Sequence, residues 1–235
     1  CTLAPTVTGE DSGELIGAAW SLGVPHPPGY PVWTLLAHAF TWIPFGTVGW
    51  RVNLLSAICA AGTVSLLVLI AITLTRNRVA ALSAALIFAF SRVFWEQALI
   101  AEVYTLSTFF IALLLLMGLR GFREERLRWL WAYTLLVGLG TGVHNTLILL
   151  VPFWAMLAWR QMSPAMRADR SLYVKSALLF VCGLLVHTYL PLAARQNPAV
   201  NWGDPSTIER WMAVLRRDQF AFMLDQYPRN ASRFF

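Results

Sequence analysis

The sequence predicts an all-α membrane protein, in which several transmembrane helices pack into a bundle. Of its 235 residues, 57% are hydrophobic and only 13% are charged, whereas soluble domains carry about 25% charged residues. Long apolar stretches recur along the chain, and Lys and Arg gather in alternate turns between them. Most of the surface must therefore face lipid. We expect membrane lipid as a partner and no nucleic acid, despite the net charge of +6.

The two ends of the chain predict a piece of a longer protein. The sequence starts at Cys1 without an initiator Met, and residues 1–5 are too short for a signal peptide or a membrane span. We interpret them as the remainder of a first transmembrane helix. The other end, at Phe235, shows no helix-terminating signal. We therefore expect the chain to be a fragment.

The first loop, residues 11–49, is expected to lie on the membrane surface. Residues 11–22 place Leu and Ala side chains at three- and four-residue spacing, which is typical of an amphipathic helix. A rigid, proline-rich turn follows at residues 26–31. Residues 34–43 form a second short helix, because they are too few to cross roughly 30 Å of hydrocarbon. Both short helices are therefore predicted to be interfacial.

Six membrane spans are expected after this loop. They are residues 53–75, 79–94, 101–119, 129–143, 146–159 and 176–194. Together with the first loop, the spans make up a predicted transmembrane domain over residues 1–194. Residues 195–235 are polar enough to lie outside the membrane, and a helix is predicted there over residues 207–222.

Basic residues set the predicted orientation of the bundle. The turns after positions 75, 119 and 159 hold ten Lys and Arg, whereas the opposite turns hold three, Arg51, Arg92 and Arg195. Short loops rich in Lys and Arg face the cytoplasm. The first loop, the turns near Glu102 and His144, and the tail are therefore expected on the extracytoplasmic face. Because the loops are compact, we expect the membrane to be a bacterial plasma (inner) membrane.

Three carboxylates gather in the first loop, at Glu10, Asp11 and Glu14. A carboxylate at the boundary between water and lipid suits a general base that takes a proton from an alcohol or an amide. The same cluster suits a divalent cation, so a metal site stays open at this stage. The structural alternative is that Asp11 caps the amphipathic helix, with Glu14 completing a capping box.

Other polar residues predicted on the same face are candidates for binding the donor or the acceptor. An ionisable residue near a span is costly in lipid and therefore usually functional, and Arg can pair with phosphate oxygens. Apolar grooves between helices suit an isoprenoid tail. The candidates are His26, Tyr30, Arg51, Glu102, Tyr104, His144, Asn145 and Arg195. The alternatives are local or interhelical hydrogen bonding for the histidines and snorkelling anchors for the arginines.

Five motifs resemble a family of polytopic membrane proteins related to transmembrane protein 260. They are TVTGEDSGEL at residues 6–15, HPPGYP at 26–31, WRVNL at 50–54, AEVY at 101–104 and NWGDP at 201–205. The resemblance covers nearly the whole chain. That family belongs to the GT-C superfamily of glycosyltransferases, which use lipid-phosphate sugars as donors.

The resemblance implies a GT-C-type bundle whose first extracytoplasmic loop bears the catalytic acid. It implies an inverting enzyme that moves a sugar, expected to be mannose, from a polyprenyl-phosphate donor to a hydroxyl of a protein or glycan acceptor. The matching acidic pair is Glu10 and Asp11. Asp11 is then the expected general base, and Glu10 and Glu14 would orient the acceptor or bind a cation. Protein O-mannosyltransferases of this type work without a metal, so we assign no definite cofactor.

A transporter or flippase of lipid-linked sugars is the alternative from another functional class. Transporter sites lie near the membrane midplane on broken helices, often between inverted repeats. We find no internal repeat in the sequence, and the charged residues gather at one predicted face. A non-catalytic scaffold is a third hypothesis, and it predicts that Asp11→Asn leaves every activity unchanged.

Overall fold

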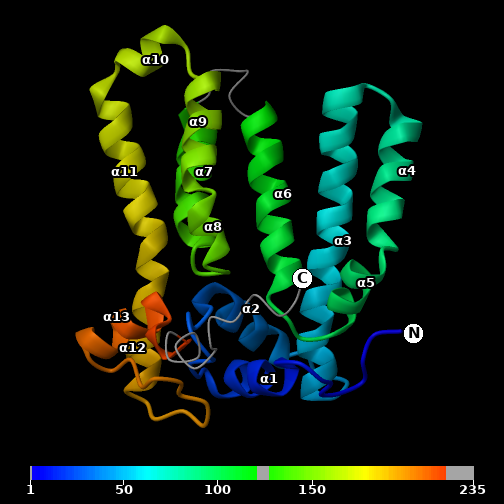
Figure 1. The fold of residues 1–235 in the computed structure, drawn as a ribbon, viewed down its shortest axis with the longest axis vertical. Coiled ribbons are helices and arrows are strands. Elements are labelled where there is room, and N and C mark those ends of the chain that lie inside the picture. Colours follow the sequence, from blue (N-terminus) through cyan, green and yellow to red (C-terminus); the bar gives the residue numbers. More distant parts are fainter. Residues whose placement is uncertain (1, 121–126, 221–235) are drawn as a thin grey trace, which may run out of the picture.

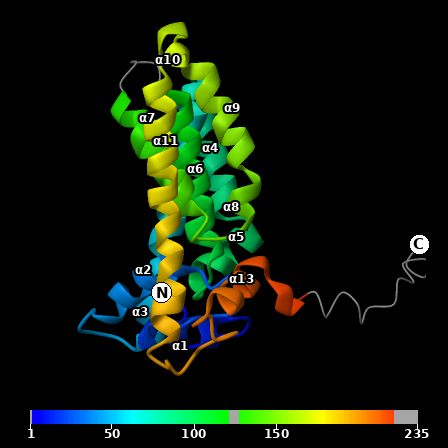
Figure 2. The same ribbon diagram turned by 90° about the vertical axis from the view of Figure 1, so that its left-hand side faces the viewer.

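The computed structural model describes residues 2–120 and 127–220, and every regular element in these ranges is a helix (Figure 1). The upright helices are α3 (Val48–Thr75), α4 (Arg78–Ala89), α6 (Tyr104–Arg120), α7 (Leu127–Gly140), α9 (Val151–Gln161) and α11 (Arg170–Leu184). At one end lie the short helices α1 (Ser12–Ser21), α2 (Pro31–Thr41) and α13 (Ile208–Arg216), as Figure 2 also shows. The predicted all-α class is confirmed.

Among the residues that the structure describes, two helical segments are long and apolar enough to cross a membrane. They are α3 and the run Arg170–Ala194, in which α11 continues through η1 (Leu185–Thr188) into α12 (Tyr189–Ala194). The pair α4 and α5 (Arg92–Leu99) meets the same criterion only as one broken span, bent by 64°. In the described ranges, α6 and α7 are shorter apolar helices. The chain is therefore an integral membrane protein, while the six spans and the domain limits stay predictions.

The bundle is held together by close backbone approach. Helix α3 packs against α4 and α6, and α7 packs against α11. A Cβ on Gly138 of α7 would lie 2.3 Å from the carbonyl oxygen of Phe180, and one on Gly183 of α11 would lie 2.5 Å from that of Leu135. Small residues let helices approach closely in membranes. The contact between α7 and α11 therefore requires glycine at both positions.

The layer of short helices is fastened to the bundle by a buried aromatic core. Trp33 of α2 is fully buried and clusters with Leu15 of α1, Val52 of α3 and Leu106 of α6. Its indole Nε1 donates a hydrogen bond of 3.1 Å to the carbonyl oxygen of Glu102, in the turn before α6. Because these contacts join four elements, α1 and α2 have a fixed position over the bases of α3 and α6.

The two ends of the bundle differ in charge, as the sequence predicts. The turn between α3 and α4 carries Arg76 and Arg78, and the short helix α10 (Pro164–Ala168) carries Arg167. Both lie at the end opposite to α1 and α2 (Figure 1). The assignment of these ends to the two sides of the membrane stays a prediction.

The tail after α12 folds back onto the first loop. An isolated parallel bridge joins Val24 to Asn201. The helix predicted at 207–222 is broken at Arg217: α13 ends at Arg216, residues 218–220 are helical again, and residues 221–222 lie outside the described ranges. The N-cap of α13 is Thr207, whose hydroxyl accepts the Arg210 N–H. Asp204 pairs with the Arg210 side chain.

Candidate functional site

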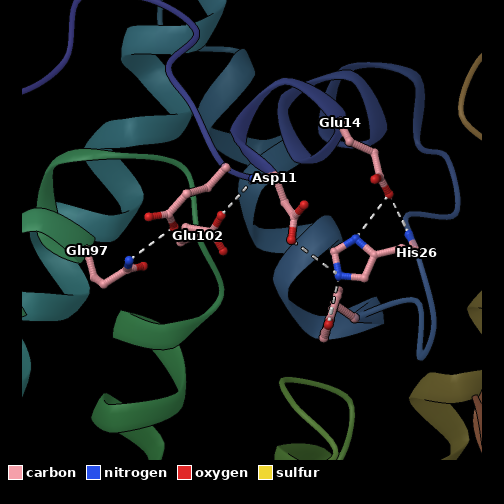
Figure 3. A network of polar contacts seen from close by, with 7 residues as sticks. Asp11, Glu14, His26, Gln97 and Glu102 are labelled. Atoms are coloured by element: carbon pink, nitrogen blue, oxygen red, sulfur yellow. Dashed lines mark hydrogen bonds and ion pairs between the residues drawn. The ribbon is translucent and has the colours of Figure 1, made fainter. Parts of the chain in front are cut away.

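The acidic cluster of the first loop closes around a histidine (Figure 3). Asp11 occupies the N-cap position of α1, Glu14 lies in the first turn of α1, and His26 belongs to the loop before α2. Potential ligand atoms of these three side chains all lie within 4.8 Å of one another. The Asp11 side chain is 57% exposed and that of His26 only 14%. A water-accessible carboxylate therefore stands next to a mostly buried imidazole.

His26 is held from both sides of its ring. Its backbone N–H donates to Glu14 Oε1 at 2.5 Å, and its Nδ1 lies 3.3 Å from the same oxygen. Its Nε2 lies 3.0 Å from the Tyr30 hydroxyl and 3.8 Å from Asp11 Oδ2. The capping-box hypothesis is wrong, because the Asp11 side chain makes no capping bond and the Glu14 carboxylate is used on His26. A ring that can carry a positive charge is the stronger partner for that carboxylate.

The surroundings of His26 favour its charged form. Burial alone would lower the pKa of this imidazole, but the hydrogen bond and charge of Glu14 outweigh it, and Asp11 and Glu102 add negative charge, so the pKa is raised above 6.5. In the charged form both ring nitrogens are donors. In that form Nδ1 donates to Glu14, and Nε2 donates to Tyr30 or Asp11.

Glu102 fixes the start of α1 from a distant part of the chain. Its Oε1 accepts the backbone N–H of Asp11 at 3.2 Å, across a separation of 91 residues. The residue is only 3% exposed. Burial raises the pKa of its carboxyl to about 7, although the Asp11 hydrogen bond acts in the opposite direction. Glu102 is one of the predicted binding residues, and in the structure its carboxylate holds the backbone N–H of Asp11.

Glu10 borders a cavity on the other side of Asp11. Its backbone is left-handed, with φ 58°, and its Oε2 accepts a hydrogen bond of 3.2 Å from Gln97 Nε2 (Figure 3). The cavity has a volume of about 570 Å³ and mostly apolar walls from α4, α5 and α6, including Phe88, Phe94 and Tyr104. Glu10 and Gln97 thus give a largely apolar cavity a polar border.

The predicted residues His144 and Asn145 join the site through aromatic contacts. The His144 ring stacks on Tyr30, with centroids 5.7 Å apart and planes 13° apart, and it lies 6.0 Å from the Tyr104 ring. Asn145 Nδ2 donates to the carbonyl oxygen of Leu215, near the end of α13. The structure therefore brings Tyr30, Tyr104 and His144 together, and Asn145 ties the tail to them.

The arginine near this site is not one that the sequence suggested. Arg51 donates to the carbonyl oxygens of Thr41, Phe45 and Gly46 and so closes the turn before α3. Arg195 is exposed at the end of α12.

Arg217, directly after α13, is the cation whose field reaches the site. Burial lowers the pKa of His144, and the charge of Arg217 lowers it further. The same charge opposes the burial-driven rise in the pKa of Tyr30. The Nε atom of Arg217 is buried and has no hydrogen-bond partner among the described residues. The one sequence signal for Arg217 was its place inside the helix predicted over residues 207–222.

A divalent cation fits the donor types of Asp11, Glu14 and His26 but competes with their hydrogen bonds. A metal needs a neutral imidazole nitrogen as its ligand. Here the pKa of His26 is raised, and its Nδ1 atom lies 3.3 Å from Glu14 Oε1. We therefore build no chemical step on a cation.

Comparison with known proteins points to one family. A family model described as the N-terminal domain of protein O-mannosyl-transferase TMEM260 matches residues 11–167. The mouse (Mus musculus) protein O-mannosyl-transferase TMEM260 is 35% identical over 228 residues, which cover 93% of this chain and 32% of that protein. The Dictyostelium discoideum protein O-mannosyl-transferase tmem260 is 27% identical over 240 residues, covering 93% of this chain and 29% of that protein. The chain thus spans about a third of the length of these relatives. No solved structure matches it significantly.

Proposed function

The chain belongs to the TMEM260 family of protein O-mannosyl-transferases, and from that membership we propose that it moves a mannosyl group from a polyprenyl-phosphate donor to a protein hydroxyl. The reaction would take place at the end of the bundle where α1 and α2 lie. Because the basic turns lie at the other end, this end is assigned to the extracytoplasmic side. The names of the relatives support mannose as the transferred sugar and a protein as its acceptor.

A lipid-linked donor is supported by the cavity beside Glu10. Its volume of about 570 Å³ lies in the range of small-molecule sites. An isoprenoid chain suits the apolar wall at Phe88, and a sugar suits the polar border at Glu10 and Gln97. Arg217 suits the phosphate, because guanidinium groups bind phosphate oxygens in pairs.

The chemical step assigns one role to each side chain. Asp11 is the base and accepts the proton of the acceptor hydroxyl. At the same time, the oxygen of that hydroxyl attacks the anomeric carbon of the sugar. The bond between that carbon and the phosphate oxygen breaks, and the phosphate leaves with the electron pair. Attack from the face opposite to the leaving group inverts the anomeric configuration. Arg217 stabilises the charge that develops on the phosphate.

The residues around Asp11 support its role as a base. Glu102 holds its backbone N–H at 3.2 Å, and positioning a reacting group in this way lowers the barrier. The Nε2 atom of His26 lies 3.8 Å from Asp11 Oδ2, so a ring that can carry a positive charge stands beside the proposed base. One observation carries the proposal. The Asp11 carboxylate is exposed, its backbone is fixed by Glu102, and the preceding residue, Glu10, borders an apolar cavity.

Sugar transfer in membranes tests the proposal directly. Radiolabelled polyprenyl-phosphate-mannose is incubated with membranes that contain the wild type, Asp11→Asn or Glu96→Gln at equal expression. We expect Asp11→Asn to lower transfer to protein by about 10³-fold. Glu96 is an exposed carboxylate that pairs with Arg92 on α5, so Glu96→Gln should transfer like the wild type.

Two outcomes would contradict this assignment. Equal transfer by Asp11→Asn and the wild type would remove Asp11 from the chemistry. Transfer by none of the three would reject the polyprenyl-phosphate-mannose donor.

A further inference from the structure

A second, polar pocket lies on the opposite side of the acidic cluster from the apolar cavity. It has a volume of about 390 Å³ and is lined by Glu14, Ala199, Val200, Asn201, Trp202 and Gly203. One wall is the carboxylate that binds His26, and an oxygen of that carboxylate lies within 4.8 Å of one on Asp11. Asp11 therefore lies between the two spaces. Glu10, which precedes it, borders the apolar cavity, and Glu14 borders the polar pocket. The roles proposed above leave this pocket unused.

The floor of the pocket is the segment 199–203, which pairs with the first loop at Asn201 and then turns at Trp202 and Gly203. Val24 donates its N–H to the carbonyl oxygen of Val200 at 2.8 Å, and Trp202 donates its N–H to the carbonyl oxygen of Val24 at 2.9 Å. Gly23 allows this approach, because a Cβ there would lie 2.3 Å from the Val200 carbonyl oxygen. The segment is thus held rigidly by the loop that carries His26.

The bridge leaves one backbone edge of the segment unused. In an extended chain, successive residues direct their N–H and C=O groups to opposite sides. Val200 and Trp202 bond to Val24, so the N–H and C=O of Asn201 face away from it. Neither group has a backbone partner among the described residues. A free strand edge of this kind can pair with an added peptide strand.

We propose that this pocket binds the acceptor polypeptide as an extended strand paired with Asn201, which delivers its Ser or Thr hydroxyl past Glu14 to Asp11. The inference rests on the proposed transferase function and deepens it. Trp202, 45% exposed, provides an aromatic face for the side chains of the bound strand, and aromatic residues dominate the energy of such contacts. The Glu14 carboxylate is an acceptor for a hydroxyl proton. A donor in the apolar cavity and an acceptor in the polar pocket would reach Asp11 from different sides.

Truncation of Trp202 tests the site with kinetics. The probe is a synthetic peptide of alternating Val and Thr, and the control variant is Trp42→Ala, which truncates a Trp that is 74% exposed at the end of α2. We expect Trp202→Ala to raise the KM for the peptide about tenfold. The kcat and the KM for the lipid donor should stay unchanged, and Trp42→Ala should match the wild type. An unchanged peptide KM in Trp202→Ala would overturn the inference.

N-methylated peptides test whether the pairing is strand-like. Methyl groups on the amides of one peptide edge should abolish binding, and methyl groups on the other edge should leave it intact. Equal binding of both peptides would reject strand pairing.

Binding of a fluorescent form of the peptide, measured without donor, separates the two proposals. Binding that depends on Trp202, together with no transfer by the wild type, would reject the transferase proposal and keep the peptide site. Transfer by the wild type, together with binding that is indifferent to Trp202, would reject the site alone.

Discussion

The layer of short helices and the α7–α11 pair are both tightly fastened, but by different interactions. The layer is fixed by polar bonds between distant residues, such as Asp11 to Glu102, and by the Trp33 indole. The pair is fixed by glycine-to-backbone contact at Gly138 and Gly183. Close packing determines only the shape of the bundle. The hydrogen bonds of the layer also determine where its charges and protons lie. Changes in the pair should therefore alter stability at every pH, and changes in the layer should alter activity and the pH dependence of activity and stability.

The largest effect is expected from a side chain placed between α7 and α11. Gly138→Leu would force atoms into the space 2.3 Å from the Phe180 carbonyl oxygen, and overpacking against backbone costs more than about 3 kcal/mol. Thermal unfolding in detergent should show no folded population. Gly140→Ala is the control, because its Cβ would make an ordinary contact of 3.4 Å with Phe110. A folded Gly138→Leu protein with normal stability would contradict the packing side of the comparison.

Glu102→Gln should change how stability depends on pH. The pKa of Glu102 is raised to about 7, so the folded state keeps a proton that the unfolded state loses near pH 4.5. The stabilising effect is complete below pH 4.5 and is lost as pH rises to about 7, a change on the order of 3 kcal/mol. Gln keeps an oxygen for the Asp11 N–H and cannot ionise.

Thermal unfolding at pH 5 and pH 8 measures this difference. The wild type and Glu96→Gln should lose stability between the two values, and Glu102→Gln should lose much less. The same slope in all three proteins would show that Glu102 does not titrate as its burial indicates.

Arg217→Gln should reduce transfer about 100-fold at unchanged stability, because loss of one charged donor to a developing anion has about this effect. The control is Arg216→Gln, which alters the preceding residue, an exposed arginine paired with Asp218 at 3.2 Å. Initial rates with the polyprenyl-phosphate donor measure both variants. Equal losses in the two variants would indicate a general effect of basic charge rather than a phosphate site.

The smallest effect is expected from His26→Gln, a loss of about tenfold with a changed pH profile. The pKa of His26 is raised above 6.5, so its stabilising positive charge is fully present below pH 6.5 and is lost as pH rises through the raised value. Wild-type transfer should fall in that range, and His26→Gln should lack this decline. His38→Gln serves as control, because the Nδ1 atom of His38 bonds the Ala19 carbonyl oxygen rather than a carboxylate. An unchanged pH profile of transfer in His26→Gln would show that His26 does not influence Asp11.

Local sequence patterns predicted the positions of helices well where the pattern within one helix was sufficient. The amphipathic stretch at 11–22 became α1, and the stretch at 34–43 became most of α2. The break at Arg217 was missed, because the left-handed backbone of Arg217 interrupts the helix before residues 218–220 and no Gly or Pro marks the position.

The candidate site was only partly predictable, because its decisive contacts are non-local. Asp11, Glu14 and His26 stand within one loop, so their proximity followed from sequence. The link from Asp11 to Glu102 spans 91 residues, and no local pattern encodes it. The capping-box pattern at Asp11 and Glu14 failed because His26, further along the same loop, takes the Glu14 carboxylate.

The bond between Asp11 and Glu102 also has a consequence for biosynthesis. A ribosome adds about 5 to 20 residues per second, so the 91 residues between the partners take about 5 to 20 s to make. During that interval the nascent first loop is already made, and the carboxylate that fixes its helix does not yet exist. Arg217 arrives later still. Assembly of the site therefore waits for most of the chain to be inserted, and a nascent chain that stops before this point lacks the complete site.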